Sequence, residues 1–302
     1  MRWLVTLACA CSTTPPAASG GKIITAITLD WEGAELAPES FTALAQLRKA
    51  IGPAPITHFV SAAYFGKDKQ AGPKIAAAIQ PGDELAVHLH AWRSLAVASG
   101  IAPRVSPSFL TGTDEVVELE GDAGFDTDLD TYDVPALRAL LRTSRKLLEQ
   151  THVRVSHSFR AGGYLATPKV LLAARDEGFT VDSSAVDRRA LADAKEEELA
   201  ARLGALWPNV DASTQPVVRE PGLLEMPIAG VTDYVSATDI VQTFERARAR
   251  LRSQPDRDVF VVLAFHLETA PDYAARLQEA LAKVGAVQYV TIEEAAELFR
   301  FQ

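Results

Sequence analysis

Short apolar segments rich in β-branched residues alternate along the chain with longer segments whose apolar residues recur at helical spacing. The segments that predict strands are 22–29, 55–62, 84–90, 155–159, 179–181, 222–227, 258–265 and 287–290. The segments that predict helices are 38–50, 73–79, 134–149, 168–177, 189–202, 239–252, 273–284 and 291–299. Strands that alternate with helices form a parallel sheet joined by crossover helices, so we expect an α/β fold.

Polar side chains capable of chemistry follow many of the predicted strands. They are Asp30, Glu32, His88, His90, Arg160, Asp182, Glu225 and His266. An open sheet needs such residues at only one or two strand ends, whereas a barrel gathers them on the rim formed by the carboxyl ends of its strands. The pattern therefore favours a closed or nearly closed α/β barrel with an active site on that rim.

Two pairs among these residues have the spacing of a metal site. His88 and His90 are two apart, as are Asp30 and Glu32, and residues two apart in a strand point to the same face. Two histidines and one carboxylate, with coordination positions left open, are typical of a catalytic zinc site. One carboxylate would bind the metal, and the other could be the general base for an attacking water. The competing interpretation of the histidines is two polar residues at a strand end.

The remaining strand-end residues suit supporting roles. His266 ends a continuous apolar strand and suits a general acid that protonates a leaving amine or alkoxide. Arg160 could orient the base carboxylate and lower its pKa. Asp182 could orient His266 or could simply cap a turn. Glu225 could face the substrate or only accept hydrogen bonds from backbone amides.

Aromatic residues and glycines near these positions could contact the substrate. Trp31, Trp92 and Tyr64 would offer flat apolar faces on which sugar C–H groups pack. The backbone at 162–163, two glycines, allows amides to approach an oxyanion closely. His58 lies in the middle of a predicted strand, and we expect it to be a packed, hydrogen-bonded histidine.

Composition limits the partners and the chemistry. The chain has 302 residues and a net charge of −9, which argues against a nucleic acid as partner. Both cysteines, Cys9 and Cys11, lie within residues 1–20, so any metal must be held by His, Asp or Glu.

Residues 1–20 predict export. A short apolar stretch follows Arg2 and leads to Cys11, in the manner of a bacterial lipoprotein signal, with Cys9 as a competing site of lipid attachment. The stretch is too short to span a bilayer. We expect an exported protein of the cell envelope whose membrane contact is this anchor alone, followed by one catalytic domain over residues 21–302. The alternative is an ordinary N-terminus.

Residues 93–133 interrupt the alternation of strands and helices. They are rich in proline, glycine, serine and acidic residues. Long segments of this kind are often functional lids, and a solvated excursion over the surface is the alternative.

Four motifs together resemble the NodB-type polysaccharide deacetylases, carbohydrate esterase family four, over residues 22 to about 300. They are Thr28-Leu29-Asp30-Trp31-Glu32-Gly33, the segment from His88 onward, Arg160-Ala161-Gly162-Gly163-Tyr164, and Ala264-Phe265-His266. The resemblance implies a deformed (β/α)7 barrel, a divalent metal with zinc as the first expectation, and hydrolysis of N-acetyl or O-acetyl groups on a polysaccharide. It implies that Asp30 is the base, that His266 is the acid, and that Tyr164 lies at the substrate.

The sequence departs from the family pattern at three places. The adjacent Asp-Asp pair of the family is replaced by Asp30-Trp31-Glu32, so Glu32 is the expected metal ligand, with Asp30 as the alternative. The family's two metal histidines are usually four apart, whereas His90 is two residues from His88; His90 is therefore either a ligand or a contact to sugar or to a ligand. The arginine motif has one extra residue before Tyr164.

Three functions follow from these features. The leading interpretation is an envelope-associated, metal-dependent carbohydrate deacetylase. The altered ligand set motivates a second, a catalytically inactive glycan-binding barrel. The third is an amidohydrolase that acts on a small C–N substrate with the same metal centre.

Overall fold

The computed structural model describes residues 20–189 and 197–300. The predicted export segment lies outside the described residues except for Gly20, and so do residues 190–196 of the helix predicted at 189–202. In the two described ranges, no helix is long and apolar enough to cross a membrane.

Strands and helices alternate along most of the chain. The strands are β1 (Ile23–Trp31), β2 (Ile56–Ser61), β3 (Glu84–Leu89), β4 (Glu118–Leu119), β5 (Asp122–Ala123), β6 (Val155–Ala161), β7 (Val181–Asp182), β8 (Val217–Arg219), β9 (Leu223–Glu225), β10 (Ile228–Val231), β11 (Val259–His266) and β12 (Gln288–Val290). The α-helices are α1 (Pro38–Ile51), α2 (Tyr64–Lys67), α3 (Ala71–Ala78), α4 (Arg93–Ala98), α5 (Val134–Leu148), α6 (Pro168–Asp176), α8 (Glu197–Leu206), α9 (Ala237–Ser253), α10 (Ala270–Val284) and α11 (Ile292–Arg300). Short 3₁₀ turns are η1 (Leu129–Thr131), η2 (Glu149–Thr151) and η3 (Gly162–Tyr164).

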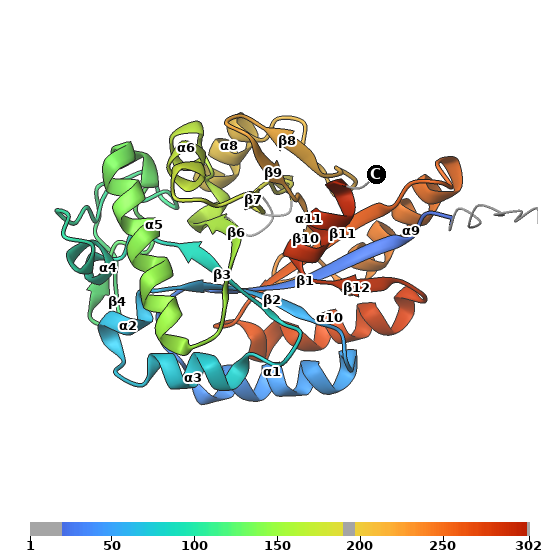
Figure 1. Ribbon diagram of the computed structural model, residues 1–302, viewed down its shortest axis with the longest axis horizontal. Helices are drawn as coiled ribbons and strands as arrows, with labels where there is room; N and C mark the ends of the chain where they lie inside the picture. The colour runs from blue at the N-terminus through green and yellow to red at the C-terminus, as the bar shows by residue number, and fades with distance from the viewer. Residues whose placement is uncertain (1–19, 190–196, 301–302) are drawn as a thin grey trace, which may run out of the picture.

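The main sheet curls into a barrel that is nearly closed. Its strands follow the order β10-β11-β1-β2-β3-β6-β7-β9-β8, and β12 also pairs with β1. The pairs from β10 to β9 are parallel, and β8 pairs with β9 in the antiparallel sense. Val186, just after β7, bridges Ile228 of β10, which joins β10 at one end of the parallel series to the segment that follows β7 near the other end. Figure 1 shows the strands at the centre and the helices around them, as the predicted deformed (β/α)7 barrel requires.

The alternation of side chains along β1 separates the interior of the barrel from the layer beneath the helices. All nine residues of β1 are buried. Thr28 and Asp30 both contact Arg160 on one face. Trp31, between Asp30 and Glu32, points to the other face and packs edge-on against Phe41 of α1, with ring centroids 5.7 Å apart. Asp30 and Glu32 are thereby directed to the barrel interior and its rim.

The helix and strand ends mostly follow the predicted pattern, with a few differences. Asp133 caps α5 as expected, because its carboxylate accepts the Ala136 amide at 2.9 Å. The predicted strand 179–181 is the two-residue β7, and β8 and β10 were not predicted. The segment 93–133 is not a plain loop, since it contains α4, the β4–β5 hairpin and η1.

His58 is structural, as predicted. It is fully buried on β2, accepts the indole N–H of Trp31 at 3.2 Å, and contacts the guanidinium of Arg48 at 3.2 Å. Asp83 pairs with Arg48 and lies 3.4 Å from the His58 ring. The group ties β2 to α1 on the side of the sheet away from the barrel interior.

Candidate metal centre and active site

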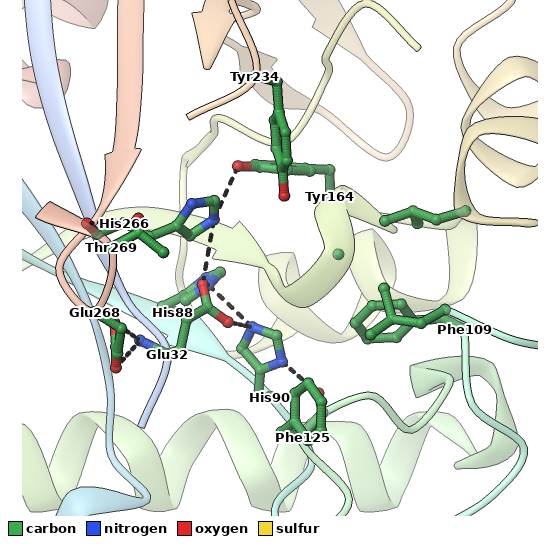
Figure 2. Close-up of a pocket in the computed structure, with 13 residues that line it drawn as sticks. Glu32, His88, His90, Phe109, Phe125, Tyr164, Tyr234, His266, Glu268 and Thr269 are labelled. Atoms are coloured by element: carbon green, nitrogen blue, oxygen red, sulfur yellow. Dashed lines mark hydrogen bonds and ion pairs between the residues drawn. The ribbon is translucent and has the colours of Figure 1, made fainter. Parts of the chain in front are cut away.

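Glu32, His88 and His90 meet at the carboxyl ends of β1 and β3. The Nε2 atoms of His88 and His90 lie 3.2 Å and 2.7 Å from the two carboxylate oxygens of Glu32, and 3.1 Å from each other. One ligand atom from each residue lies within 4.8 Å of the others, which makes this a group that could hold a metal ion. Figure 2 shows the three side chains converging at the pocket.

The hydrogen bonds of the two histidines leave their Nε2 atoms available for a metal. His88 Nδ1 donates to the carbonyl oxygen of Arg160 at 3.1 Å, and His90 Nδ1 donates to that of Phe125. A carbonyl oxygen can only accept, so each Nδ1 carries a proton, and in the neutral ring, the form that binds a metal, each Nε2 offers its lone pair on the side of Glu32. Ligands of a tetrahedral zinc ion lie about 3.3 Å apart, given metal–nitrogen distances of about 2.0–2.1 Å. The observed separations fit a divalent ion.

Glu32 supplies the negative charge of this group. Burial by itself would raise the pKa of Glu32, but the charges and hydrogen bonds of His90 and His88 outweigh burial and hold that pKa well below its ordinary value. Conversely, although burial lowers the pKa of His90, the Glu32 carboxylate raises it above the ordinary value. The centre therefore favours positive charge next to Glu32, whether as protons or as a metal cation.

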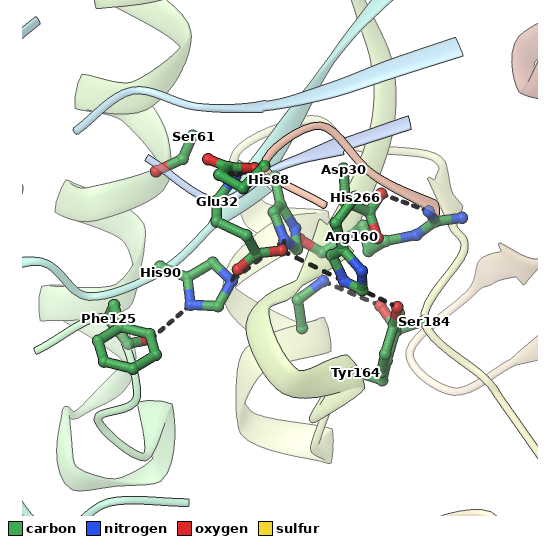
Figure 3. A network of polar contacts seen from close by, with 12 residues as sticks. Asp30, Glu32, Ser61, His88, His90, Phe125, Arg160, Tyr164, Ser184 and His266 are labelled. Atoms are coloured by element: carbon green, nitrogen blue, oxygen red, sulfur yellow. Dashed lines mark hydrogen bonds and ion pairs between the residues drawn. The ribbon is translucent and has the colours of Figure 1, made fainter. Parts of the chain in front are cut away.

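A fully buried ion pair lies beside the centre. Arg160 Nη1 donates to Asp30 Oδ1 at 2.5 Å, and its Nε donates to the Ser183 carbonyl at 2.6 Å. The guanidinium also stacks over Phe59, 4.1 Å from the ring centroid. The second carboxylate oxygen, Asp30 Oδ2, is buried and has no hydrogen-bond partner among the described residues. Figure 3 shows Asp30 and Arg160 next to His266 and to Glu32, His88 and His90, the candidate metal-ligand group.

His266 stands at the edge of the centre with Asp233 behind it. Its Nε2 lies 3.5 Å from Glu32 Oε1 and 3.3 Å from the Tyr164 hydroxyl, while its Nδ1 pairs with Asp233 Oδ2. Burial lowers the pKa of His266, but the negative charge of Asp233, with smaller contributions from Glu32 and Asp30, raises it to about 10. His266 is therefore held as an imidazolium whose Nε2 faces the pocket.

The prediction that Asp182 orients His266 is wrong. Asp182 lies on β7, where it accepts a hydrogen bond from Ser184 and lies beside Glu225 of β9. Asp233 occupies the position behind His266 that was predicted for Asp182. Val231 of β10 pairs with Ala264 of β11, so Asp233, two residues beyond Val231, lies level with His266.

Glu225 is a structural residue and does not line the pocket. Its carboxylate accepts the amide N–H of Ala185 at 2.9 Å, which is the alternative stated from the sequence. Burial, together with the neighbouring charge of Asp182, raises the pKa of Glu225 well above its ordinary value.

The predicted aromatic faces are buried in the core. Trp31 and Trp92 are fully buried, so neither can stack on a sugar. The Trp92 indole donates to the Glu32 carbonyl at 2.8 Å, and the ammonium of Lys67 lies 3.5 Å above its ring. Tyr64 is also buried and donates its hydroxyl to Glu268 at 2.6 Å. Of the predicted aromatic contacts, only Tyr164 lines the pocket.

The glycines of the arginine motif allow close packing against the centre. A Cβ atom on Gly162 would lie 2.6 Å from the His90 ring, and one on Gly163 would lie 2.8 Å from Phe109. Gly163 also has a φ of +58°, a backbone conformation that favours glycine. These glycines are therefore required by the approach of η3 to His90 and to the segment 93–133.

Several pocket residues were not found from the sequence. They are Phe109, Leu110, Phe125, Leu199, Tyr234, Glu268 and Thr269. Glu268 accepts the Glu32 amide at 3.1 Å, and burial, followed by the charge of Glu32, raises its pKa to about 7. Glu268 could have been found from the sequence, because it lies two residues after His266 at the end of a strand. The aromatic residues of 93–133 have no such spacing to any residue of the site.

Fold and site together define an α/β barrel with a Glu-His-His group on its rim. No family model matches the sequence, and no curated protein matches it. Two crystal structures are similar to this chain in fold. One is a candidate polysaccharide deacetylase from Mycobacterium smegmatis, with 17% identity and a TM-score of 0.56 over 94% of this chain and 92% of that chain. The other is Puue allantoinase, with 12% identity and a TM-score of 0.55 over 95% and 92%. Both share the fold of this chain.

Proposed function

We propose that this protein is a metal-dependent hydrolase that removes acetyl groups, as N-acetyl or O-acetyl, from a carbohydrate of the cell envelope or its surroundings. The observation that carries the proposal is the convergence of Glu32, His88 and His90 with His266 at one end of the barrel. The fold shared with a candidate polysaccharide deacetylase agrees with it. Residues 1–20, with Cys11 or Cys9 as lipid-attachment site, would place the protein in the envelope.

The carboxylate of Glu32 and the Nε2 atoms of His88 and His90 would hold the metal. A divalent ion held there would polarise a substrate carbonyl and make water more acidic. Imidazole and carboxylate ligands suit zinc, and the same ligands also bind other first-row divalent metals.

Asp30 is the proposed base. Arg160 binds one of its oxygens, which leaves Oδ2, without a hydrogen-bond partner among the described residues, to take a proton from the attacking water. Glu268 provides the comparison, because it lines the pocket and its pKa is raised to about 7. Asp30→Asn should lower the hydrolysis rate more than Glu268→Gln does, and the reverse order would assign the base to Glu268.

His266 is the proposed acid. Asp233 keeps its Nδ1 side occupied, so the Nε2 proton faces the pocket and can pass to the leaving amine or alkoxide. The raised pKa of His266 keeps this proton in place at neutral pH. A general acid in this position contributes about 10²–10⁴-fold to the rate.

The experiment measures acetate release from N- and O-acetylated oligosaccharides by protein stripped with a chelator and then reloaded with zinc. We expect release only after reloading, loss of release and of zinc in His88→Ala, and a loss of at least about 100-fold with retained zinc in His266→Ala. His152→Ala is the control, because His152 is exposed and lies in the turn after η2. Acetate release that survives His266→Ala would overturn the mechanism, and glycan binding without zinc would favour a non-catalytic barrel.

The size of the pocket favours a second candidate. The pocket encloses about 210 Å³, below the 300–1,000 Å³ or so that is usual for ligand pockets. A small amide substrate would fit within it, and the fold shared with an allantoinase agrees with an amidohydrolase. Hydrolysis of small cyclic or open-chain amides, with no release from acetylated oligosaccharides, would establish this alternative.

A further inference from the structure

The pocket has a charged floor and an apolar wall. The floor is formed by His266 and the candidate metal-ligand group, Glu32, His88 and His90. The wall is formed by Phe109, Leu110, Phe125, Leu199, Tyr164 and Tyr234. Figure 2 shows Phe109 and Phe125 on the side of the pocket away from His266, with Tyr164 and Tyr234 above it. Phe109, Leu110 and Phe125 come from the segment 93–133, and Leu199 comes from α8.

The wall is held rigidly to the metal-ligand group. The Phe125 carbonyl accepts the Nδ1 proton of His90, and its ring lies 5.6 Å from that of Trp92. The Phe109 ring lies 6.2 Å from the His90 ring and rests against Gly163, where any Cβ would collide with it. The Phe109 amide also donates to the Asp126 carbonyl at 2.7 Å. A wall fixed in this way forms the pocket before any ligand arrives.

The polar groups among the described lining residues already have partners within the protein. The Tyr164 hydroxyl lies against His266, and the Thr269 hydroxyl donates to Asp233 at 2.9 Å. Glu268 accepts from the Glu32 amide and from Tyr64. A sugar ring placed inside would have to bury hydroxyls against hydrocarbon, which is costly. Methylene groups placed there would gain about fourfold in affinity each.

We propose that this pocket binds the acyl part of the substrate, and that it accommodates apolar acyl chains longer than acetyl, up to about four to six carbons. The volume of 210 Å³ corresponds to about seven groups of the size of water, enough for such a chain with its carbonyl. The carbohydrate, or other leaving group, then lies at the mouth of the pocket. This inference rests on the proposed function, because it assumes that the carbonyl is placed at the Glu32, His88 and His90 group.

Binding of hydroxamic acids to the zinc-loaded protein tests the inference without requiring turnover. Acetohydroxamic, butanohydroxamic and hexanohydroxamic acids share one metal-binding head and differ only in chain length. Calorimetric titration should show affinity rising about fifteenfold from acetyl to butanoyl and further to hexanoyl. Phe109→Ala and, independently, Leu110→Ala should reduce that rise to threefold or less. Val97→Ala on α4 is the control, since Val97 is 63% exposed and does not line the pocket.

The outcomes separate this inference from the proposed function. Equal affinities for the three acids, with acetyl esters still hydrolysed, would overturn the inference and leave the hydrolase proposal intact. Rising affinities with no hydrolysis of any ester or amide would support the acyl pocket and overturn the hydrolase proposal. A protein that binds no divalent metal ion in titration would overturn both.

Discussion

The contact between Asp233 and His266 yields a prediction with a defined magnitude. Asp233 is almost fully buried, pairs with His266 Nδ1, and accepts the Thr269 hydroxyl at 2.9 Å. Burial alone would lower the pKa of His266, and the charge of Asp233 is the main cause of its rise from 6.5 to about 10. At about 1.36 kcal/mol per pKa unit, this rise corresponds to about 5 kcal/mol in favour of the imidazolium.

Asp233→Asn removes the negative charge while its amide oxygen can still accept the Nδ1 proton. Burial is then the largest influence on the ring, so the pKa of His266 should fall to 6.5 or below. At pH 8 the imidazolium fraction would drop from nearly all to about one molecule in thirty. Since the folded-state pKa of the wild type is raised, its contribution to stability is complete below pH 6.5 and is lost as the pH rises toward 10. The variant should therefore lose most stability at pH 6 and little above pH 10.

The assay is an NMR titration of the His266 ring in metal-free protein, because a bound cation would add its own charge beside Glu32. Urea unfolding at pH 6 and pH 10 measures the linked stability. Asp114→Asn, at an exposed position of the segment 93–133, is the charge-matched control. A His266 pKa in Asp233→Asn that stays within one unit of the wild-type value would refute the reasoning.

Three further predictions concern the ion pair, the buried histidine and the metal. Arg160→Met leaves Asp30 buried without its partner, so urea unfolding should show a loss of about 3–5 kcal/mol; a loss below about 1 kcal/mol would contradict this. Burial lowers the pKa of His58, so the folded state resists the proton that the unfolded chain takes up below pH 6.5, and stability should decrease as the pH falls from 7 to 5; His58→Asn should remove this part of the pH dependence. Glu32→Gln should weaken zinc binding at least about 100-fold by calorimetry, whereas Glu35→Gln, at an exposed position, should leave it unchanged.

The period of two in strands explains both a success and an error of the sequence interpretation. It correctly placed His88 beside His90, and Glu32 on the face of Asp30. The same period puts Trp31 on the opposite face, beneath α1, so its assignment to the substrate site conflicted with the rule that located the carboxylates. Trp92 could not be placed in this way, because it lies beyond the end of β3, where the chain no longer alternates between two faces.

The sequence by itself determined the architecture and the floor of the site. Alternating strands and helices encode a parallel barrel, and the barrel brings residues at its strand ends to one rim whatever their separation along the chain.

Only the tertiary structure decided which groups complete that floor and which wall stands over it. Asp233 follows β10, a short strand containing glycine that shows no clear pattern of its own, and it reaches His266 only through the β10–β11 register. Phe109 and Phe125 come from an insertion whose course is fixed by contacts with His90, Trp92 and Gly163. Such contacts depend on how separate segments pack in space, and no local periodicity in the sequence encodes that packing.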